Sequence, residues 1–309
     1  MNPINLLFQF ADSFAFIVLS AVGLAVIFGM MGVINLGHGE FIMIGAYGTT
    51  LAANAGVPLV AAMAVGVLVT AIFGFVVERT IITGAAINWI TERTLGRSVI
   101  DPLYDRLLDS MVATWAIGLL LTQGIRIVFG NSIPQLGTPL GSVQYGAFSY
   151  SIYRVLLAVV AVCVLLGLYV VFTRTEFGIR ARATIQDADT ARSLGVDTDR
   201  MYTTTFVIGS ALAGLTGALY APSLTVVPSM GSAFLVEAFV AVVVGGPSVL
   251  FGTTLSGGVL GAINALFTNL YGTFFGQIAM LLTAILVIRL LSNGLTGLIE
   301  DIRDRMVGE

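Results

Sequence analysis

The sequence contains no lysine, one histidine and one cysteine. Charged residues make up 10% of its 309 residues, against about 25% in soluble domains. A single cysteine cannot form an internal disulfide, and together with a single histidine it cannot supply a usual metal cluster or nucleophilic catalytic set. We therefore predict no metal site, no catalytic residues and no nucleic-acid partner, and we expect the chain not to be an enzyme.

Apolar residues dominate instead. They make up 57% of the chain, and its mean hydropathy is +0.98, which indicates an integral membrane protein surrounded by lipid. A spanning helix needs about 20 apolar residues, and eight or nine stretches approach this length. We predict an all-α polytopic membrane protein with a single transmembrane domain over 1–309. The candidate spans are 9–30, 33–54, 58–78, 109–129, 152–173, 201–222, 233–250, 253–271 and 273–291.

The arginines fall mainly on one side of these spans. They concentrate in the connection 79–108, in the segment 174–200 and in the C-terminal tail, which contains Arg303 and Arg305. The opposite loop, 130–150, contains none. Because basic residues favour the cytoplasmic side, we predict that the three arginine-containing segments are cytoplasmic and that 130–150 lies outside. Nine full crossings would place the N-terminus outside and the C-terminus inside.

A polar group interrupts the second apolar stretch. Asn35, His38 and Glu40 lie among glycines, including Gly39, within an otherwise apolar tract. Unpaired polar groups cost several kcal/mol in hydrocarbon, so we expect them to have a role at a broken or closely packed helix. Two interpretations stay open. The three side chains line a translocation pathway, or they brace the break, where Asn35 would satisfy freed backbone groups.

The segment 174–200 is too polar to span the membrane. Apolar residues recur near helical spacing, and Gly195 after Leu194 is typical of a helix end. A short amphipathic helix at the cytoplasmic face would suit docking onto a partner, although it could also simply connect two spans. The predicted apolar stripe consists of Ile179, Ala183, Ile185, Ala188 and Ala191.

Several motifs resemble one family in order along the chain. The segment 34–40, the Val-Val-Gly-Gly run at 243–246 and a set of positions in the cytoplasmic loop are similar to the permease subunits of branched-chain amino acid and urea ABC importers. The segment 113–120 is similar to the urea-type branch. The matching loop positions are Thr175, Gly178, Arg182, Ala183, Asp187, Leu194, Gly195, Thr198 and Arg200.

This resemblance implies a multi-pass importer permease in a bacterial inner membrane. Its partners would be a second homologous permease subunit, two ATP-binding subunits and an extracytoplasmic substrate-binding protein. The chain has no phosphate-binding glycine loop, so the partners would bind ATP and Mg²⁺, and we expect no cofactor here. Gly39, Gly245 and Gly246 are expected to have structural roles. The expected ATPase-coupling residues are Glu176, Gly178, Arg180, Arg182, Asp187, Leu194 and Gly195.

Glu237 bears on the cargo because it lies inside an apolar span. The resemblance associates an acid near this position with urea transport, and urea has N–H donors that acceptors such as Glu237, Glu40 and Asn35 match. No arginine lies deep in a span, so we predict urea or a short amide as the cargo. The alternatives are branched-chain or other hydrophobic amino acids in the same machinery, a proton-coupled secondary transporter, or a passive urea channel.

Overall fold

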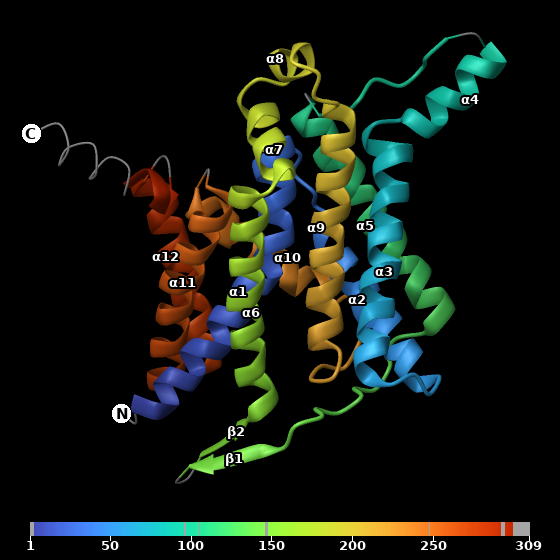
Figure 1. The fold of residues 1–309 in the computed structure, drawn as a ribbon. Helices are drawn as coiled ribbons and strands as arrows, with labels where there is room; N and C mark the ends of the chain where they lie inside the picture. Colours follow the sequence, from blue (N-terminus) through green and yellow to red (C-terminus); the bar gives the residue numbers. More distant parts are fainter. Residues whose placement is uncertain are drawn as a thin grey trace, which may run out of the picture. The chain divides into compact units, whose positions relative to one another are not determined.

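The computed structural model describes residues 3–95, 97–104, 106–145, 148–246, 248–291 and 294–298. Arg303, Arg305 and Pro247 lie outside these ranges. The regular secondary structure of the described residues is helical apart from one hairpin (Figure 1), which confirms the predicted all-α membrane fold. Its elements are α1 (Pro3–Met31), α2 (His38–Asn54), α3 (Leu59–Val77), the π-helical turn η1 (Glu78–Ile82), α4 (Ala85–Leu95), α5 (Leu107–Phe129), β1 (Ser142–Tyr145), β2 (Phe148–Ser151), α6 (Ile152–Arg174), α7 (Glu176–Gln186), α8 (Ala188–Ser193), α9 (Thr198–Tyr220), α10 (Gly231–Gly245), α11 (Val249–Tyr271) and α12 (Thr273–Leu290).

Each of the nine predicted spans corresponds to a helix. Within the described ranges, seven helices are long and apolar enough to cross a membrane: α1, α3 with η1, α5, α6, α9, α11 and α12. The two others are α2, with 17 residues, and α10, with 15. At 1.5 Å per residue they measure about 26 and 22 Å, less than the ~30 Å hydrocarbon core. Neither is long enough to cross the core by itself.

The helices form two compact units, each assembled from distant parts of the sequence. One unit comprises 1–25, 138–170 and 236–309, and the other comprises 26–137 and 171–235. We call them the first and second unit. The domain boundaries predicted from the sequence stay a prediction.

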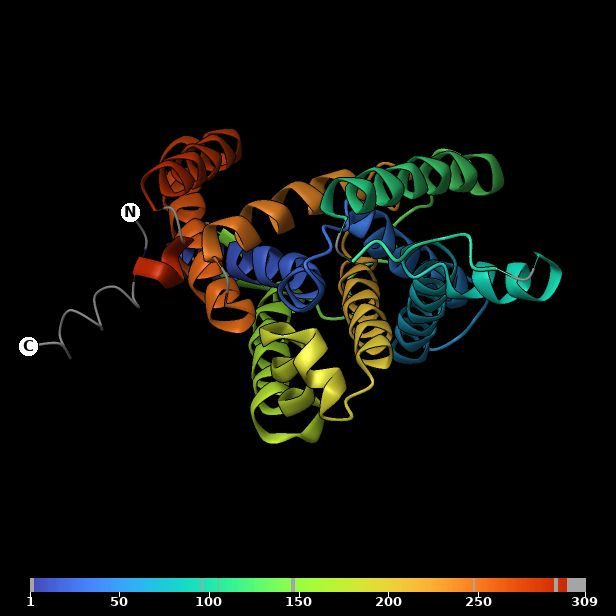
Figure 2. The same cartoon turned by 90° about the horizontal axis from the view of Figure 1, so that it is seen from above.

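Three helices form the centre of the second unit. The helices α2, α3 and α9 pack against one another, as the view from above shows (Figure 2). Glycines allow this approach: Gly217 of α9 lies directly on the Ile42 carbonyl of α2, and Gly45 of α2 lies on Gly214 of α9. Small residues at helix contacts let the backbones come close enough for dispersion to hold helices together in lipid.

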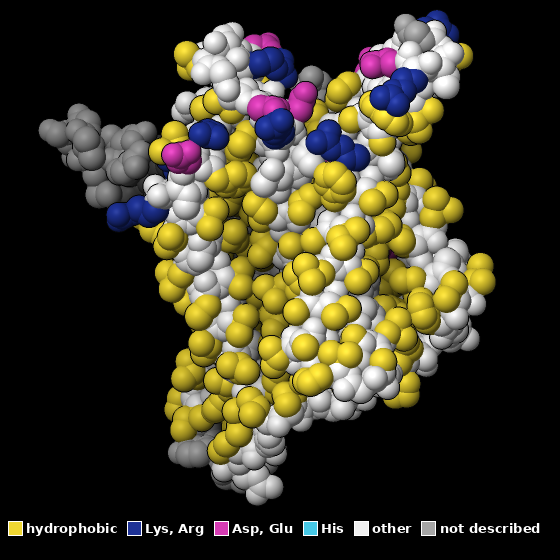
Figure 3. All heavy atoms as spheres, turned by 45° about the vertical axis from the view of Figure 1, so that its right-hand side comes forward, with side chains coloured by type: hydrophobic (Ala, Val, Ile, Leu, Met, Phe, Trp, Pro, Cys, Tyr) yellow, Lys and Arg dark blue, Asp and Glu magenta, His cyan; other side chains and the backbone are white. Residues whose placement is uncertain are grey.

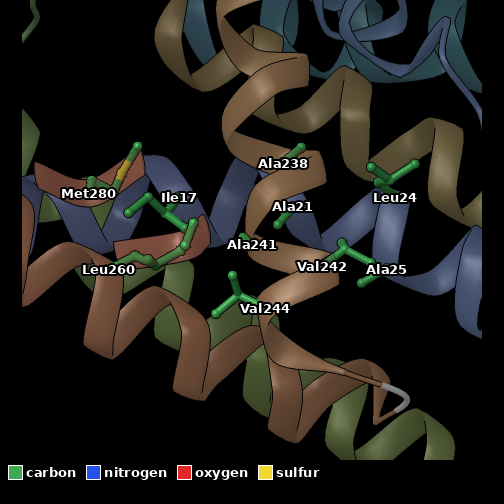
Figure 4. Close-up of a cluster of buried hydrophobic side chains, with 11 residues drawn as sticks. Ile17, Ala21, Leu24, Ala25, Ala238, Ala241, Val242, Val244, Leu260 and Met280 are labelled. Atoms are coloured by element: carbon green, nitrogen blue, oxygen red, sulfur yellow. The ribbon is translucent and has the colours of Figure 1, made fainter. Parts of the chain in front are cut away.

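The core of the first unit joins α1, α10, α11 and α12 (Figure 4). The Ser13 hydroxyl of α1 donates to Asn264 Oδ1 of α11 over 3.0 Å. Gly245 and Gly252 bring α10 and α11 together, and Gly246 follows with a φ of +87°. The apolar cluster consists of Ile17, Ala21, Leu24, Ala25, Ala238, Ala241, Val242, Val244, Leu260, Met280 and Ala284.

Charged side chains gather at one end of the second unit, over α4, α7 and α8, while apolar side chains cover the helices below them (Figure 3). In the connection 79–108, the Tyr104 hydroxyl donates to the buried Glu78 carboxylate over 2.7 Å. Burial and this hydrogen bond raise the pKa of Tyr104 far above its usual range. The polar connection is therefore anchored to the end of α3.

Candidate functional site

The site begins at the break between α1 and α2, over residues 32–37. Gly32 has a φ of +66°, a left-handed conformation that glycine adopts at little cost. The buried Asn35 side chain accepts the Gly37 N–H at Oδ1 over 3.0 Å, and the Asn35 carbonyl accepts the His38 N–H over 3.2 Å. Asn35 therefore satisfies backbone groups that the break has freed from the helical pattern.

The hydroxyl of Thr114 connects the break to α5. Thr114 is buried, and its Oγ1 accepts the Leu36 N–H over 3.0 Å. The same hydroxyl lies 2.8 Å from the Ser110 carbonyl, 3.2 Å from the Met111 carbonyl and 3.3 Å from the Ile34 carbonyl, any of which can accept its proton. No local sequence pattern predicted a role for Thr114, although a threonine in an apolar helix is a common interhelical partner.

We predict that Thr114→Val destabilises the protein by about 1–3 kcal/mol, because the Leu36 N–H loses its acceptor away from water. The matched control is Thr283→Val in α12, where the hydroxyl donates to the Ala279 carbonyl of its own helix. Thermal unfolding in detergent would measure both variants. Equal melting temperatures for the two would show that Thr114 does not anchor the break.

His38 and Glu40 begin α2. His38 is fully buried, and the Glu40 carboxylate faces α5, where a Cβ added to Gly118 would lie 3.1 Å from Oε2. No donor among the described residues bonds to this Oε2 atom. Between His38 and Glu40, Gly39 packs directly against the carbonyl of Gly231, the first residue of α10. The first turn of α2 thus presents a carboxylate oxygen whose bonding capacity the surrounding protein leaves unused.

The predicted polar set is brought together only in part. Asn35, His38 and Glu40 share the second unit with Thr114, whereas Glu237 is a half-buried residue of α10 in the first unit. The pathway role of all four stays a prediction.

The segment after α6 folds into α7 and α8. Gly178 lies on the Phe172 carbonyl at the end of α6, and Arg182 Nη1 donates to that carbonyl over 2.5 Å. A cation is favourable at the C-terminal carbonyls of a helix. Gly178 and Arg182 therefore hold α7 against α6.

Local hydrogen bonds shape α8 as well. Asp187 Oδ1 accepts the N–H groups of Thr190 at 2.9 Å and Asp189 at 3.0 Å. Bonds from Thr190, first its backbone N–H and then its hydroxyl, lower the pKa of Asp187. Helix α8 ends at Ser193, with Leu194 as its C-cap, and Gly195 follows with a φ of +87°. The ion pair Glu176–Arg180, at 2.9 Å, is exposed, and such pairs contribute little.

Comparison with known proteins agrees with this layout of helices. A family described as "Branched-chain amino acid transport system / permease component" matches residues 6–291. The chain belongs to this permease family. The permease is 30% identical over 293 residues to the high-affinity branched-chain amino acid transport system permease protein BraD of Pseudomonas aeruginosa, covering 90% of this chain and 91% of the relative.

Two further relatives extend the comparison. The permease is 28% identical over 291 residues to LivH of Salmonella typhimurium, named as a high-affinity branched-chain amino acid transport system permease protein, with 90% of each chain covered. It is 26% identical over 298 residues to a probable branched-chain amino acid transport permease protein of Methanocaldococcus jannaschii, with 91% of this chain and 88% of the relative covered. No solved structure matches the permease.

Membership of this family makes the permease one component of a transport system rather than an enzyme, and a multi-pass protein of the inner membrane. The prediction of a urea-type branch finds no support in these relatives, all of which are named for branched-chain amino acids. Two features had favoured urea, the segment 113–120 and Glu237. They do not suffice to distinguish urea from an amino acid. A single acid offers an acceptor to an ammonium group as readily as to urea.

The predicted apolar stripe of the coupling segment does not lie on one face, because Ala191 is buried whereas its two isoleucines are exposed. In α7 the buried residues are Gly178, Ala181 and Thr184, so small side chains face the protein. The large ones point outward: Ile179 is 61% exposed and Ile185 is 45% exposed. Leu194, at the end of α8, is 79% exposed. The permease thus presents apolar side chains on an arginine-rich segment outside its spans.

Proposed function

We propose that the permease forms the membrane pathway of an ATP-driven importer for branched-chain or other hydrophobic amino acids. The observation that carries this proposal is the family match over residues 6–291, together with relatives that are named for such amino acids along about nine-tenths of their length. Neither urea nor a short amide has comparable support.

The break before α2 is our candidate for the pathway within the second unit. Glu40 Oε2 has no donor among the described residues, and a carboxylate oxygen can accept hydrogen bonds from an ammonium group. Asn35 and Thr114 hold the backbone of the break in place, which would keep Glu40 on its helical turn. A weak and transient contact of this kind suits a pathway, provided that a separate receptor supplies the affinity.

The outward apolar side chains of α7 and α8 support a docking role. We assign these side chains to the surface on which two partner subunits dock. Those subunits would bind ATP and Mg²⁺. Closure of these subunits would move α8 and the helix α9 that follows it. A second homologous permease subunit and an extracytoplasmic substrate-binding protein would complete the importer.

The test is the ATPase activity of the reconstituted complex with its receptor, titrated separately with L-leucine and with urea. We expect L-leucine to stimulate hydrolysis several-fold and urea to leave it at the basal rate. Stimulation by urea alone would overturn the amino-acid proposal. Leucine uptake that proceeds equally without the ATP-binding subunits would instead identify a secondary transporter.

A further inference from the structure

The first unit contains a polar cavity at the start of α6, next to the hairpin. Its volume is about 380 Å³, within the ~300–1,000 Å³ range of small-molecule sites. The hairpin lies almost entirely within the arginine-free loop 130–150, so the predicted topology places this cavity on the outer side. Its lining comes from α1, β2 and α6: Asn5, Phe8, Gln9, Asp12, Ser149, Tyr150, Ser151, Arg154 and Val155.

Two opposite charges meet in this cavity. Arg154 Nη1 lies 2.6 Å from Asp12 Oδ2, and the two side chains are 51% and 33% exposed. A guanidinium has five N–H donors in a planar fork that matches a carboxylate. The bond from Nη1 to Asp12 uses one of these donors. The pair is therefore reachable and can form further bonds.

The cavity also contains a buried acceptor and a buried hydroxyl that have no hydrogen-bond partner among the described residues. Gln9 Oε1 and Ser151 Oγ are buried and form no hydrogen bond with any described residue. Buried polar groups in folded proteins are nearly always bonded, and an exception calls for an explanation. The Gln9 oxygen is an acceptor, and the Ser151 hydroxyl can donate. One therefore complements a ligand cation and the other a ligand anion.

An apolar wall stands beside these groups. The rings of Phe8 and Tyr150 stack with centroids 4.1 Å apart, and Val155 is a third apolar residue of the lining. The Tyr150 hydroxyl donates to Asn5 Oδ1 over 2.9 Å, which fixes the ring. The wall suits an aliphatic side chain.

We propose that this cavity binds an α-amino acid as a zwitterion, with its carboxylate on Arg154 and Ser151 and its ammonium group on Asp12 and Gln9. The Asp12–Arg154 pair opens, and each member exchanges its internal partner for a ligand charge. Since charges exchange for charges, the net gain is small and the site is weak. This inference rests on the proposed function for the nature of the cargo. Arg154 is the cationic partner that the carboxylate of an amino acid requires.

The first test is cysteine protection in the complete transporter, with Cys163→Ser to remove the native thiol. Ser149→Cys places a thiol on an exposed residue of the cavity lining, and Thr138→Cys serves as the control outside it. We expect millimolar L-leucine to slow labelling by an impermeant thiosulfonate several-fold at Ser149→Cys only. The analogues 4-methylpentanoate and 3-methylbutylamine each lack one charge and should not protect.

Protection by all three compounds would overturn the zwitterion site in favour of a nonselective apolar cavity. Protection by the receptor protein but not by leucine would overturn it in favour of a docking surface. Unchanged labelling with wild-type leucine uptake would refute this inference alone. Absence of leucine uptake in the wild-type transporter would instead refute the proposed function.

A second test separates binding from a structural ion pair. Arg154→Gln and Asp12→Asn should each lower leucine uptake about tenfold, equivalent to about 1.4 kcal/mol. The double exchange Asp12→Arg with Arg154→Asp should recover thermal stability but not uptake, because it reverses the polarity of the site. The control Arg126→Gln removes an arginine of α5 that lies outside the cavity lining and donates to exposed Gln123, and it should leave uptake unchanged. Full recovery of uptake by the exchange would show a purely structural pair.

Discussion

Gly217→Ala is expected to destabilise the permease by about 3 kcal/mol or more, which is the upper range for overpacking. A Cβ at Gly217 would overlap the Ile42 carbonyl of α2 and lie 2.7 Å from the Ala46 nitrogen. Backbone atoms cannot move aside by changing rotamer, so α2 and α9 would have to separate. Loss of monodisperse, folded protein on heating in detergent is the measurement.

The control for Gly217→Ala is Gly124→Ala in α5. A Cβ at Gly124 meets no atom within 4 Å, so the change should be neutral or stabilise the helix by up to about 1 kcal/mol. Equal melting temperatures for the two variants would mean that α2 and α9 do not pack as closely as the structure has them.

The same contact bears on coupling. Helix α9 directly follows α8 and packs on α2, whose first turn contains His38 and Glu40. A displacement of α8 by a docked partner would therefore reach the polar turn through one rigid element. A variant that only loosens this packing should lower transport more than ATP hydrolysis.

Much of the helical layout follows from the sequence because each span is a long apolar run. The break over 32–37 and the helix end at Gly195 were also predictable, since glycine ends or interrupts helices. These features depend on neighbours in sequence, and a local pattern is sufficient to find them.

Features that depend on distant pairs could not be predicted in this way. Thr114 meets the break across 78 residues, and Arg154 meets Asp12 across 142. No local pattern specifies such partners. The outward direction of Ile185 is a different case, because helical spacing groups the apolar residues of α7 without showing which face packs inward. The face of α7 that contains Gly178 packs inward, because only a small residue allows α7 to approach the end of α6 so closely.

The paired substitution Ile185→Asp with Leu194→Asp is expected to weaken binding of the ATP-binding subunits about 30-fold, equivalent to about 2 kcal/mol. Both side chains are largely exposed, so the permease itself should keep its stability to within about 0.5 kcal/mol. At a covered interface, each carboxylate would lose water without gaining a partner. Co-purification of the ATP-binding subunits, followed by leucine-stimulated hydrolysis, measures the effect.

Leu95→Asp in α4 is the matched control. Leu95 is 64% exposed and lies in the other arginine-rich connection, outside α7 and α8. If any added charge at this end of the second unit weakened assembly, Leu95→Asp would act like the paired variant, and the docking role of α7 and α8 would fail. If only the paired variant releases the partner subunits, the effect belongs to apolar contact at Ile185 and Leu194. The exposed face of α7 and α8 is then the surface on which the ATP-binding subunits dock, and their movement on ATP hydrolysis displaces α9.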